Sequence, residues 1–359
     1  MTGSELMGIR IEPADAGVYA AAKRRWDTLA KPIDGLGTLE HLICRIAAIQ
    51  KKEVPEIDKK AVIVMIADNG VVRENVTQTD DSVTAEVAAL LSKKKSSLSN
   101  LLRGYPADII PVDIGIRGEP VPGVLNRRVT SGTGNIAKED AMTPAQCLQA
   151  IETGISLMDS CKEKGYGIIA TGEMGIGNTT TSTAVLCALM GTDTADLTGR
   201  GAGLSDEQLE HKIRVISSAL TFHGYTEALT GTPEEAFGIL CELGGLDLAG
   251  LTGLFIGGAK NGIPVIVDGL ISAAAALLAE TIGPGCRDYM LASHAGREKG
   301  IMRVLKRLDL IPVIDADLAL GEGTGAALLF PLLDMALSLY INGTRFDQTE
   351  IAQYERHET

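Results

Sequence analysis

Short runs of β-branched and aliphatic residues recur along the chain, each followed by a loop or a helical pattern. The runs cover residues 61–68, 108–115, 167–172, 254–258, 263–268 and 289–293. Their apolar positions are nearly continuous instead of alternating, which is typical of strands buried on both faces. The pattern therefore predicts an α/β fold with a parallel sheet covered by helices on both faces. Ligands of such sheets bind at the carboxyl ends of the strands.

Local signals mark several helices between these runs. Thr143-Pro-Ala-Gln146 and Ser205-Asp-Glu-Gln208 are capping boxes, each placing a hydroxyl residue three positions before a Gln. Residues 181–190 follow a glycine-rich turn with a helical pattern. Residues 1–30 and 331–359 are also helix-like, so we predict a small helical domain from both termini beside a large α/β domain, residues 31–330.

The charge balance restricts the partners. The chain has 46 Asp and Glu against 33 Lys and Arg, a formal net charge of −13, so we expect no nucleic acid partner. The longest apolar stretches, 270–279 and 326–340, are too short to span a bilayer, and no signal peptide opens the chain. We expect a cytoplasmic protein without a membrane partner. Its six cysteines contain no C-x-x-C pair, which favours reduced, buried thiols over a metal site or disulfides.

A glycine-rich segment at residues 171–181 is the strongest local candidate for chemistry. It follows a predicted strand and opens a predicted helix, where free amides attract an anion such as a phosphomonoester. No Gly-Lys-Ser/Thr follows, so it is not a nucleoside triphosphate loop. The alternative is a purely structural tight turn. The candidate binding residues in this segment are Glu173, Gly175, Gly177, Asn178, Thr179 and Thr180.

Two further segments carry candidate polar groups. Gly199-Arg-Gly-Ala-Gly203 precedes the helix that contains Lys212, whose ammonium could reach a ligand or extend to solvent. Leu320-Gly-Glu-Gly-Thr-Gly325 holds one carboxylate between two glycines, and Ser293-His294 ends a strand. A lone histidine beside a serine is more often structural than catalytic. No nucleophile elbow or Ser/His/Asp set is present, which disfavours a hydrolase.

These motifs occur in a specific order along nearly the whole chain. The set comprises residues 31–40, 67–72, 112–115, 172–180, 199–203, 293–294 and 320–326. Together they resemble the nicotinate-nucleotide:dimethylbenzimidazole phosphoribosyltransferase family, which activates the lower ligand of cobamides. The resemblance implies a Rossmann-like large domain, a small helical domain from both termini, and a dimer. It also implies transfer of phosphoribose from nicotinate mononucleotide to a base nitrogen, with inversion from a β to an α linkage.

The implied chemistry needs few catalytic groups. In nicotinate mononucleotide the ring nitrogen is a quaternary pyridinium, and it becomes neutral when the bond to the ribose breaks. The leaving group therefore needs no general acid, and the resemblance implies no metal or cofactor. Glu322 matches the family's catalytic glutamate, the general base for the incoming N–H. Glu173 and Lys212 match positions near the ribose and phosphate. The implied substrate-binding residues are Glu173, Gly175, Gly177, Asn178, Thr179, Thr180, Arg200, Gly201, Gly203, Lys212, Ser293, Gly321 and Gly323.

One departure from the family pattern concerns the base pocket. Where relatives place polar side chains against the benzimidazole, this chain has Thr79 and Val87. A valine cannot hydrogen-bond a base edge, so the acceptor stays open among benzimidazoles, purines and phenols. The dimer stays open as well, between a homodimer and a heterodimer with a paralog.

Two other functions remain as alternatives. An NAD-dependent oxidoreductase would use the glycine-rich loop, but the acidic residue expected at the end of a second strand is missing. A non-catalytic nucleotide-binding or regulatory paralog would keep the fold, although it would have no need for the Glu322 carboxylate.

Overall fold

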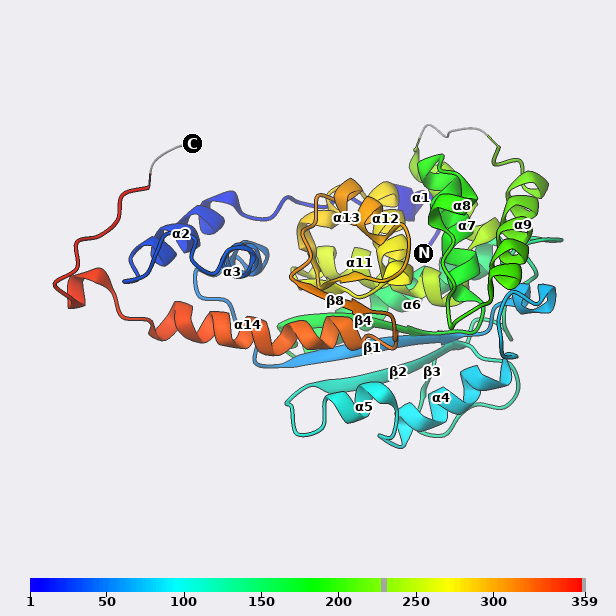
Figure 1. The fold of residues 1–359 in the computed structure, drawn as a ribbon, viewed down its shortest axis with the longest axis horizontal. Coiled ribbons are helices and arrows are strands. Elements are labelled where there is room, and N and C mark those ends of the chain that lie inside the picture. The colour runs from blue at the N-terminus through cyan, green and yellow to red at the C-terminus, as the bar shows by residue number, and fades with distance from the viewer. Residues whose placement is uncertain (227–230, 357–359) are drawn as a thin grey trace.

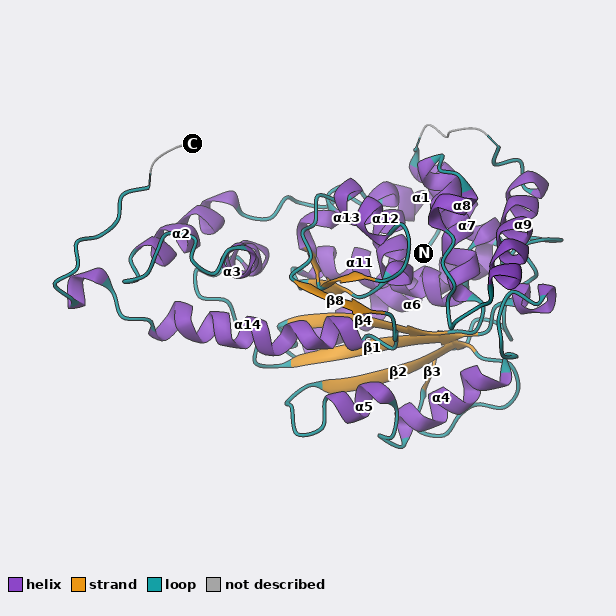
Figure 2. Cartoon of the chain, viewed as in Figure 1, coloured by secondary structure: helices purple, strands orange, loops and turns teal. Residues whose placement is uncertain are grey.

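The computed structural model describes residues 1–226 and 231–356. Six parallel strands form the main sheet in the order β3-β2-β1-β4-β5-β6, and a second parallel pair is β7-β8 (Figures 1 and 2). This confirms the predicted α/β parallel-sheet fold. The strands are β1 Lys60–Ala67, β2 Asp108–Gly115, β3 Leu125–Asn126, β4 Ile168–Met174, β5 Val265–Val267, β6 Met290–Ala292, β7 His294–Gly296 and β8 Ile314–Leu318.

Helices connect and cover the strands. They are α1 Gly3–Met7, α2 Ala16–Asp27, α3 Thr38–Gln50, η1 Gly70–Glu74, α4 Ser82–Ser92, α5 Ser97–Leu101, α6 Pro144–Glu163, α7 Asn178–Met190, α8 Thr194–Leu197, α9 Asp206–Phe222, α10 Pro233–Leu243, α11 Leu246–Asn261, α12 Leu270–Ile282, η2 Cys286–Tyr289, α13 Ile301–Arg307, α14 Thr324–Asn342 and η3 Phe346–Gln348.

Strand β1 shows how both faces of the sheet are buried. Ile63 and Met65 belong to a core cluster with residues of α6, α11 and α12, whereas Val62 and Val64 belong to a second cluster with residues of α3 and α14. Successive side chains of a strand point to opposite faces, so the two clusters lie on opposite sides of the sheet. The nearly continuous apolar pattern of the strands follows from this double coverage.

The predicted strand at residues 254–258 is wrong, because this segment lies inside helix α11. Glycines allow α11 to pack closely against α6. A Cβ on Gly154 of α6 would lie 2.2 Å from the Gly250 carbonyl oxygen, and one on Gly253 would lie 2.0 Å from that of Ile151. The glycines that suggested a strand end therefore serve a helix–helix contact.

The two predicted capping boxes are confirmed. The Thr143 hydroxyl accepts from the Gln146 amide at 3.3 Å, and the Gln146 side chain accepts in return from the Thr143 amide at 2.9 Å. Ser205 and Gln208 form the same reciprocal pair at the start of α9. The six cysteines are free and buried, as expected.

Helix α2 and the C-terminal part of α14 lie together at the narrow end of the molecule (Figure 1). Trp26 of α2 lies against Tyr340 of α14 with ring centroids 5.0 Å apart. Helix α1 instead packs Leu6 into the core shared with α6 and α11. Helix α14 runs without a break across residue 330, and the division into two domains stays a prediction.

Helix α14 is the one described helix long and apolar enough to cross a membrane. More than half of its apolar window is buried inside the protein. This burial is the pattern of a core helix.

Candidate active site

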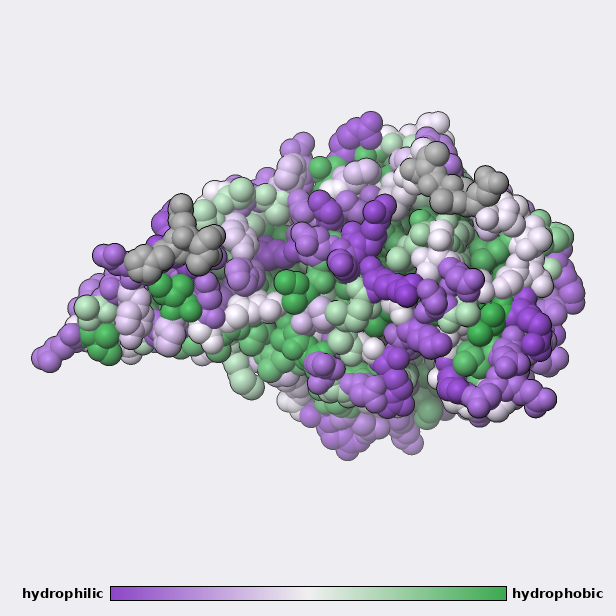
Figure 3. Space-filling model, turned by 45° about the horizontal axis from the view of Figure 1, so that its top comes forward, coloured by the Kyte–Doolittle hydropathy of each residue, from purple (hydrophilic) through white to green (hydrophobic). Residues whose placement is uncertain are grey.

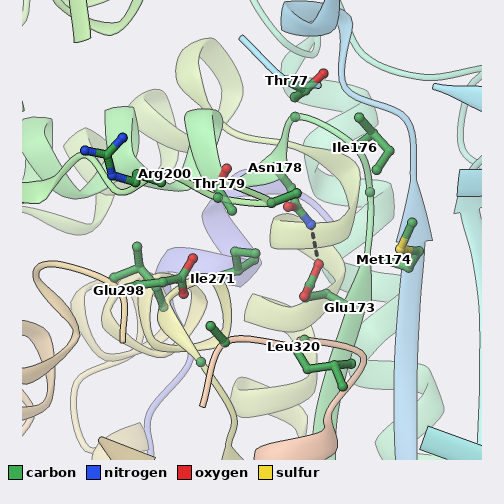
Figure 4. A pocket seen from close by; sticks show the side chains of 18 of the residues that line it. Thr77, Glu173, Met174, Ile176, Asn178, Thr179, Arg200, Ile271, Glu298 and Leu320 are labelled. Carbon is green, nitrogen blue, oxygen red and sulfur yellow. Dashed lines mark hydrogen bonds between the residues drawn. The ribbon is translucent and has the colours of Figure 1, made fainter. Parts of the chain in front are cut away.

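A cavity of about 220 Å³ opens at the carboxyl ends of β4, β5 and β6. Its walls come from the loop that opens α7, the 200–204 loop, the starts of α12 and α14, and the 318–321 segment (Figure 4). This is the position at which a parallel α/β sheet binds ligands. Of the predicted site residues, those that line the cavity are Thr79, Glu173, Gly175, Gly177, Asn178, Thr179, Arg200, Gly201, Lys212 and Gly321.

The start of α7 and Lys212 form one end of the cavity. Gly177 caps α7 in the left-handed region (φ 93°) and offers no side-chain acceptor to the helix amides. The Lys212 ammonium is buried and donates to the Thr179 hydroxyl at 2.8 Å. A Cβ on Gly201 would lie 3.6 Å from Lys212 Nζ, so the 200–204 loop approaches the ammonium closely. Lys212 therefore does not extend to solvent.

Burial lowers the pKa of Lys212 to about 8, while the Glu298 carboxylate opposes this shift. Glu298 itself lines the cavity, and burial raises its pKa. Glu298 lies in a loop without a motif and was not among the predicted site residues. An anion that enters this end of the cavity would meet one ammonium and the positive end of a helix.

Glu173 is the carboxyl group of the central cavity wall. It ends β4, is 9% exposed, and accepts a hydrogen bond from the Asn178 amide (Figure 4). Burial raises its pKa to about 8. Glu173 is therefore mostly protonated at neutral pH.

Asp268 and His294 face the cavity from the ends of β5 and β6. Ser293 donates its hydroxyl hydrogen to the Val267 carbonyl at 2.7 Å, so its 2.8 Å contact with His294 Nδ1 needs a hydrogen on Nδ1. Ser293 is buried behind His294 and orients the ring. Asp268 accepts from the Ala326 amide of α14 at 2.8 Å. Asp268 directly follows an apolar strand, and this position could have identified it as a site residue.

The Glu322 turn lies against β4. Gly321, Glu322 and Gly323 all have positive φ, of 87°, 59° and 84°. A Cβ on Gly323 would lie 2.7 Å from Val62 Cγ1 and 2.9 Å from the Thr171 carbonyl oxygen, so the turn requires glycine there. The Glu322 carboxylate accepts from the Leu98 amide at 3.2 Å and does not line the cavity, although the neighbouring Leu320 and Gly321 do.

Comparisons with known proteins agree with this geometry. The profile of a phosphoribosyltransferase family matches residues 11–351. The nicotinate-nucleotide–dimethylbenzimidazole phosphoribosyltransferase of Ruminiclostridium cellulolyticum is 41% identical over 93% of this chain and 94% of its own length. That of Acetivibrio thermocellus is 40% identical, over 93% of both chains. The chain belongs to this phosphoribosyltransferase family.

Solved structures give the same result. The crystal structure of CobT from Thermus thermophilus superposes with a TM-score of 0.87 at 35% identity, covering 94% of this chain and 100% of that one. The resemblance recognised in the sequence motifs is thereby confirmed. The chain is a glycosyltransferase of the pentosyl-transferring class.

Several predicted residues of this phosphoribosyltransferase lie outside the cavity wall. Gly203 accepts from Gln78, and Thr180 is buried within α7. Arg200 is at the cavity edge, but its guanidinium pairs with Asp206 and points away from the cavity (Figure 4). Val87 packs on α4 against the core beneath the sheet and does not line the cavity, whereas Thr79 is at the rim.

Proposed function

We propose that the protein transfers phosphoribose from nicotinate mononucleotide to an aromatic acceptor, giving an α-linked riboside phosphate and nicotinate for cobamide lower-ligand assembly. The observation that carries the proposal is the polarity of the cavity. Lys212 and the start of α7 form a cationic end, and Met174, Ile176 and Leu320 form an apolar end. The names of the relatives supply the donor and the acceptor class.

The cationic end holds the phosphate in this proposal. Thr179 and Lys212 already share a hydrogen bond, so their groups converge on one point near Gly201. A phosphomonoester there accepts hydrogen bonds from the ammonium and from free amides of α7. Asp268 and His294, on the neighbouring strand ends, face the ribose.

The apolar end receives the acceptor. Leu320 is 59% exposed at the cavity mouth, where it can pack against a bound acceptor. Thr79 at the rim is a polar contact, whereas Val87 lies outside the cavity and does not contact the acceptor. Because Met174, Ile176 and Leu320 form this end of the cavity, the enzyme selects its acceptor mainly by shape and apolar contact, which allows benzimidazoles, purines and phenols.

The reaction releases a proton from the incoming base, and we assign Glu322 as its acceptor. The bond between ribose C1′ and the nicotinate nitrogen breaks, and its electron pair stays on that nitrogen. A nitrogen of the incoming base bonds to C1′, and its proton passes to a base on the enzyme. Glu322 is the proposed acceptor of this proton, because Glu173 is already protonated at neutral pH. To accept this proton, the Glu322 carboxylate would leave the Leu98 amide and bind the substrate instead.

A homodimer is part of the proposal. Met335 and Leu339 are exposed on one side of α14, at 66% and 39%. Figure 3 also shows apolar side chains on the surface of the narrow end of the molecule. Light scattering after size exclusion tests this; a monomer at micromolar concentration would contradict it, and a need for a second gene product would indicate the heterodimer.

The test of the proposal is turnover with a panel of acceptors. The protein is incubated with nicotinate mononucleotide and dimethylbenzimidazole, adenine or phenol, with and without a chelator, and products are read by mass spectrometry. We expect nicotinate release and a riboside phosphate with at least one acceptor, unaffected by the chelator. Tight nucleotide binding without product from any acceptor would instead support the regulatory paralog.

A further inference from the structure

Two buried carboxyl groups share one amide behind the cavity wall. Asn178 Nδ2 donates to Glu173 Oε2 and, at 3.1 Å, to Asp247 Oδ2. An amide NH₂ has two hydrogens, so this group is fully used. Glu173 lines the cavity, whereas Asp247, in the first turn of α11, is 0% exposed and lies outside its wall.

The surroundings of the pair are acidic. Besides Asp247, the carboxyl groups of Asp268 and Glu298 raise the pKa of Glu173. The Lys212 ammonium, from α9, lines the same cavity but bonds to Thr179. Burial raises the pKa of Asp268, and the charge of His294, the first residue of β7, opposes this shift. Ionising Glu173 therefore adds a charge to a buried site that already contains several carboxyl groups.

The pair is asymmetric in its hydrogen bonds. Asp247 accepts a second bond, from the Leu248 amide at 2.9 Å, whereas the bond to Glu173 comes from Asn178 alone. Burial raises the pKa of Asp247 to about 6 and that of Glu173 to about 8. At neutral pH the charge lies on Asp247 and the proton on Glu173. Because Oε2 accepts from Asn178, the proton is on Oε1, the oxygen that lies beside Gly321.

We infer that Asp247 is a positioning residue that fixes the shared Asn178 amide against Glu173, and that its nearby charge keeps Glu173 a neutral acid able to donate a hydrogen bond to the bound nucleotide. The Asn178 hydrogen bond alone would favour the ionised form of Glu173. The identity of that nucleotide rests on the proposed function. Nicotinate mononucleotide has an anionic phosphate and a carboxylate, and an ionised Glu173 would repel both. A neutral acid binds their oxygens or the ribose hydroxyls without that repulsion. No proton is transferred in this step.

Carbon NMR of the protein labelled at glutamate Cδ tests the inference without turnover. The Glu173 signal of the wild type should titrate with its midpoint near pH 8 and should be absent from Glu173→Gln. The same signal should show a smaller step near pH 6, where Asp247 ionises. Asp247→Asn should lower the main midpoint by about one pH unit. Asp108→Asn, the same change at the amino end of β2, should leave it unmoved.

Kinetics provide the second readout. Both Glu173 and Lys212 lose a proton near pH 8, so a fall of wild-type kcat/KM there does not separate the two groups. The diagnostic result is that part of this fall moves to lower pH in Asp247→Asn. A Glu173 midpoint below pH 6 in the wild type would overturn the inference even if Asp247→Asn does not fold. An unmoved midpoint in a folded Asp247→Asn would do the same. Absence of turnover with an intact NMR result would contradict the proposed function alone.

Discussion

Burial sets the charge of individual side chains around the cavity. Lys212 is 1% exposed, and burial lowers its pKa while Glu298 opposes that shift; Glu173 is 9% exposed and keeps its proton. Sequence motifs identified both residues as candidates. They could not give these protonation states, because burial and the partners Glu298 and Asp247 depend on distant parts of the chain.

Replacing Lys212 with Ala should weaken binding of nicotinate mononucleotide. Among the described residues the Lys212 ammonium is the charged donor nearest the proposed phosphate, and losing a hydrogen bond to a charged group costs about 1.5–3 kcal/mol. Calorimetry measures the change, with Lys93→Ala on the exposed surface as the control. Equal affinities in the two variants would place the phosphate elsewhere.

The buried Glu173 should make stability depend on pH. Its pKa is raised in the folded protein to about 8 from 4.5, so the unfolded state loses its proton first as pH rises. The folded protein therefore loses stability between about pH 4.5 and 8, and the loss stays constant above. Glu173→Gln removes this cost.

Denaturant unfolding of the two proteins at pH 5 and pH 8 measures the effect. The stability advantage of Glu173→Gln should be small at pH 5 and grow to the order of a few kcal/mol at pH 8. The same advantage at both pH values would show that Glu173 is ionised in the folded protein.

At the scale of elements, glycines determine which segments approach one another. The glycines at 154 and 253 allow α6 and α11 to touch backbone to backbone, and Gly323 allows the Glu322 turn to lie on β4. Capping boxes were predictable because their signal is local. The 254–258 run was not, since a short apolar run with glycines fits a strand or a buried helix, and the packing of α6 decides between them.

Replacing Gly323 with Ala should displace the Glu322 turn. The new Cβ would clash with Val62 and the Thr171 carbonyl, in addition to the strain of φ 84°. We expect a stability loss of about 1–3 kcal/mol or more and a large loss of turnover. Gly118→Ala has nearly the same φ, 83°, in open space, and so measures the strain alone.

Thermal unfolding and turnover of both variants separate clash from strain. Gly323→Ala should be the less stable and the less active of the two. Equal behaviour would show that the close contact of the turn with β4 does not matter for the active site.

For the whole molecule, the sequence predicted the sheet and much of the active site, but not the residues that reach the site through tertiary packing. The parallel sheet and the site at its carboxyl end followed from the strand pattern, and ten of the residues that line the cavity followed from the ordered motifs and the family resemblance. Asp268, Glu298 and Asp247 were missed because each lies outside a motif and acquires its role from tertiary neighbours. Val87 was assigned to the base pocket, but the packing of α4 places it against the core.

The turnover of Glu322→Gln tests the central claim most directly. The turn that holds Glu322 borders the cavity through Leu320 and Gly321, and the Glu322 carboxylate accepts a hydrogen bond from the Leu98 amide. Gln keeps the shape and the hydrogen bond from Leu98 but cannot accept the proton of the incoming base. Removing a general base typically costs about 10²–10⁴ in rate.

The measurement is the turnover number with saturating nicotinate mononucleotide and the best acceptor, with nucleotide affinity measured on the same sample. The account predicts nearly normal nucleotide binding and turnover at least about a hundredfold below the wild type. A folded Glu322→Gln enzyme that retains more than about a third of wild-type turnover would contradict it.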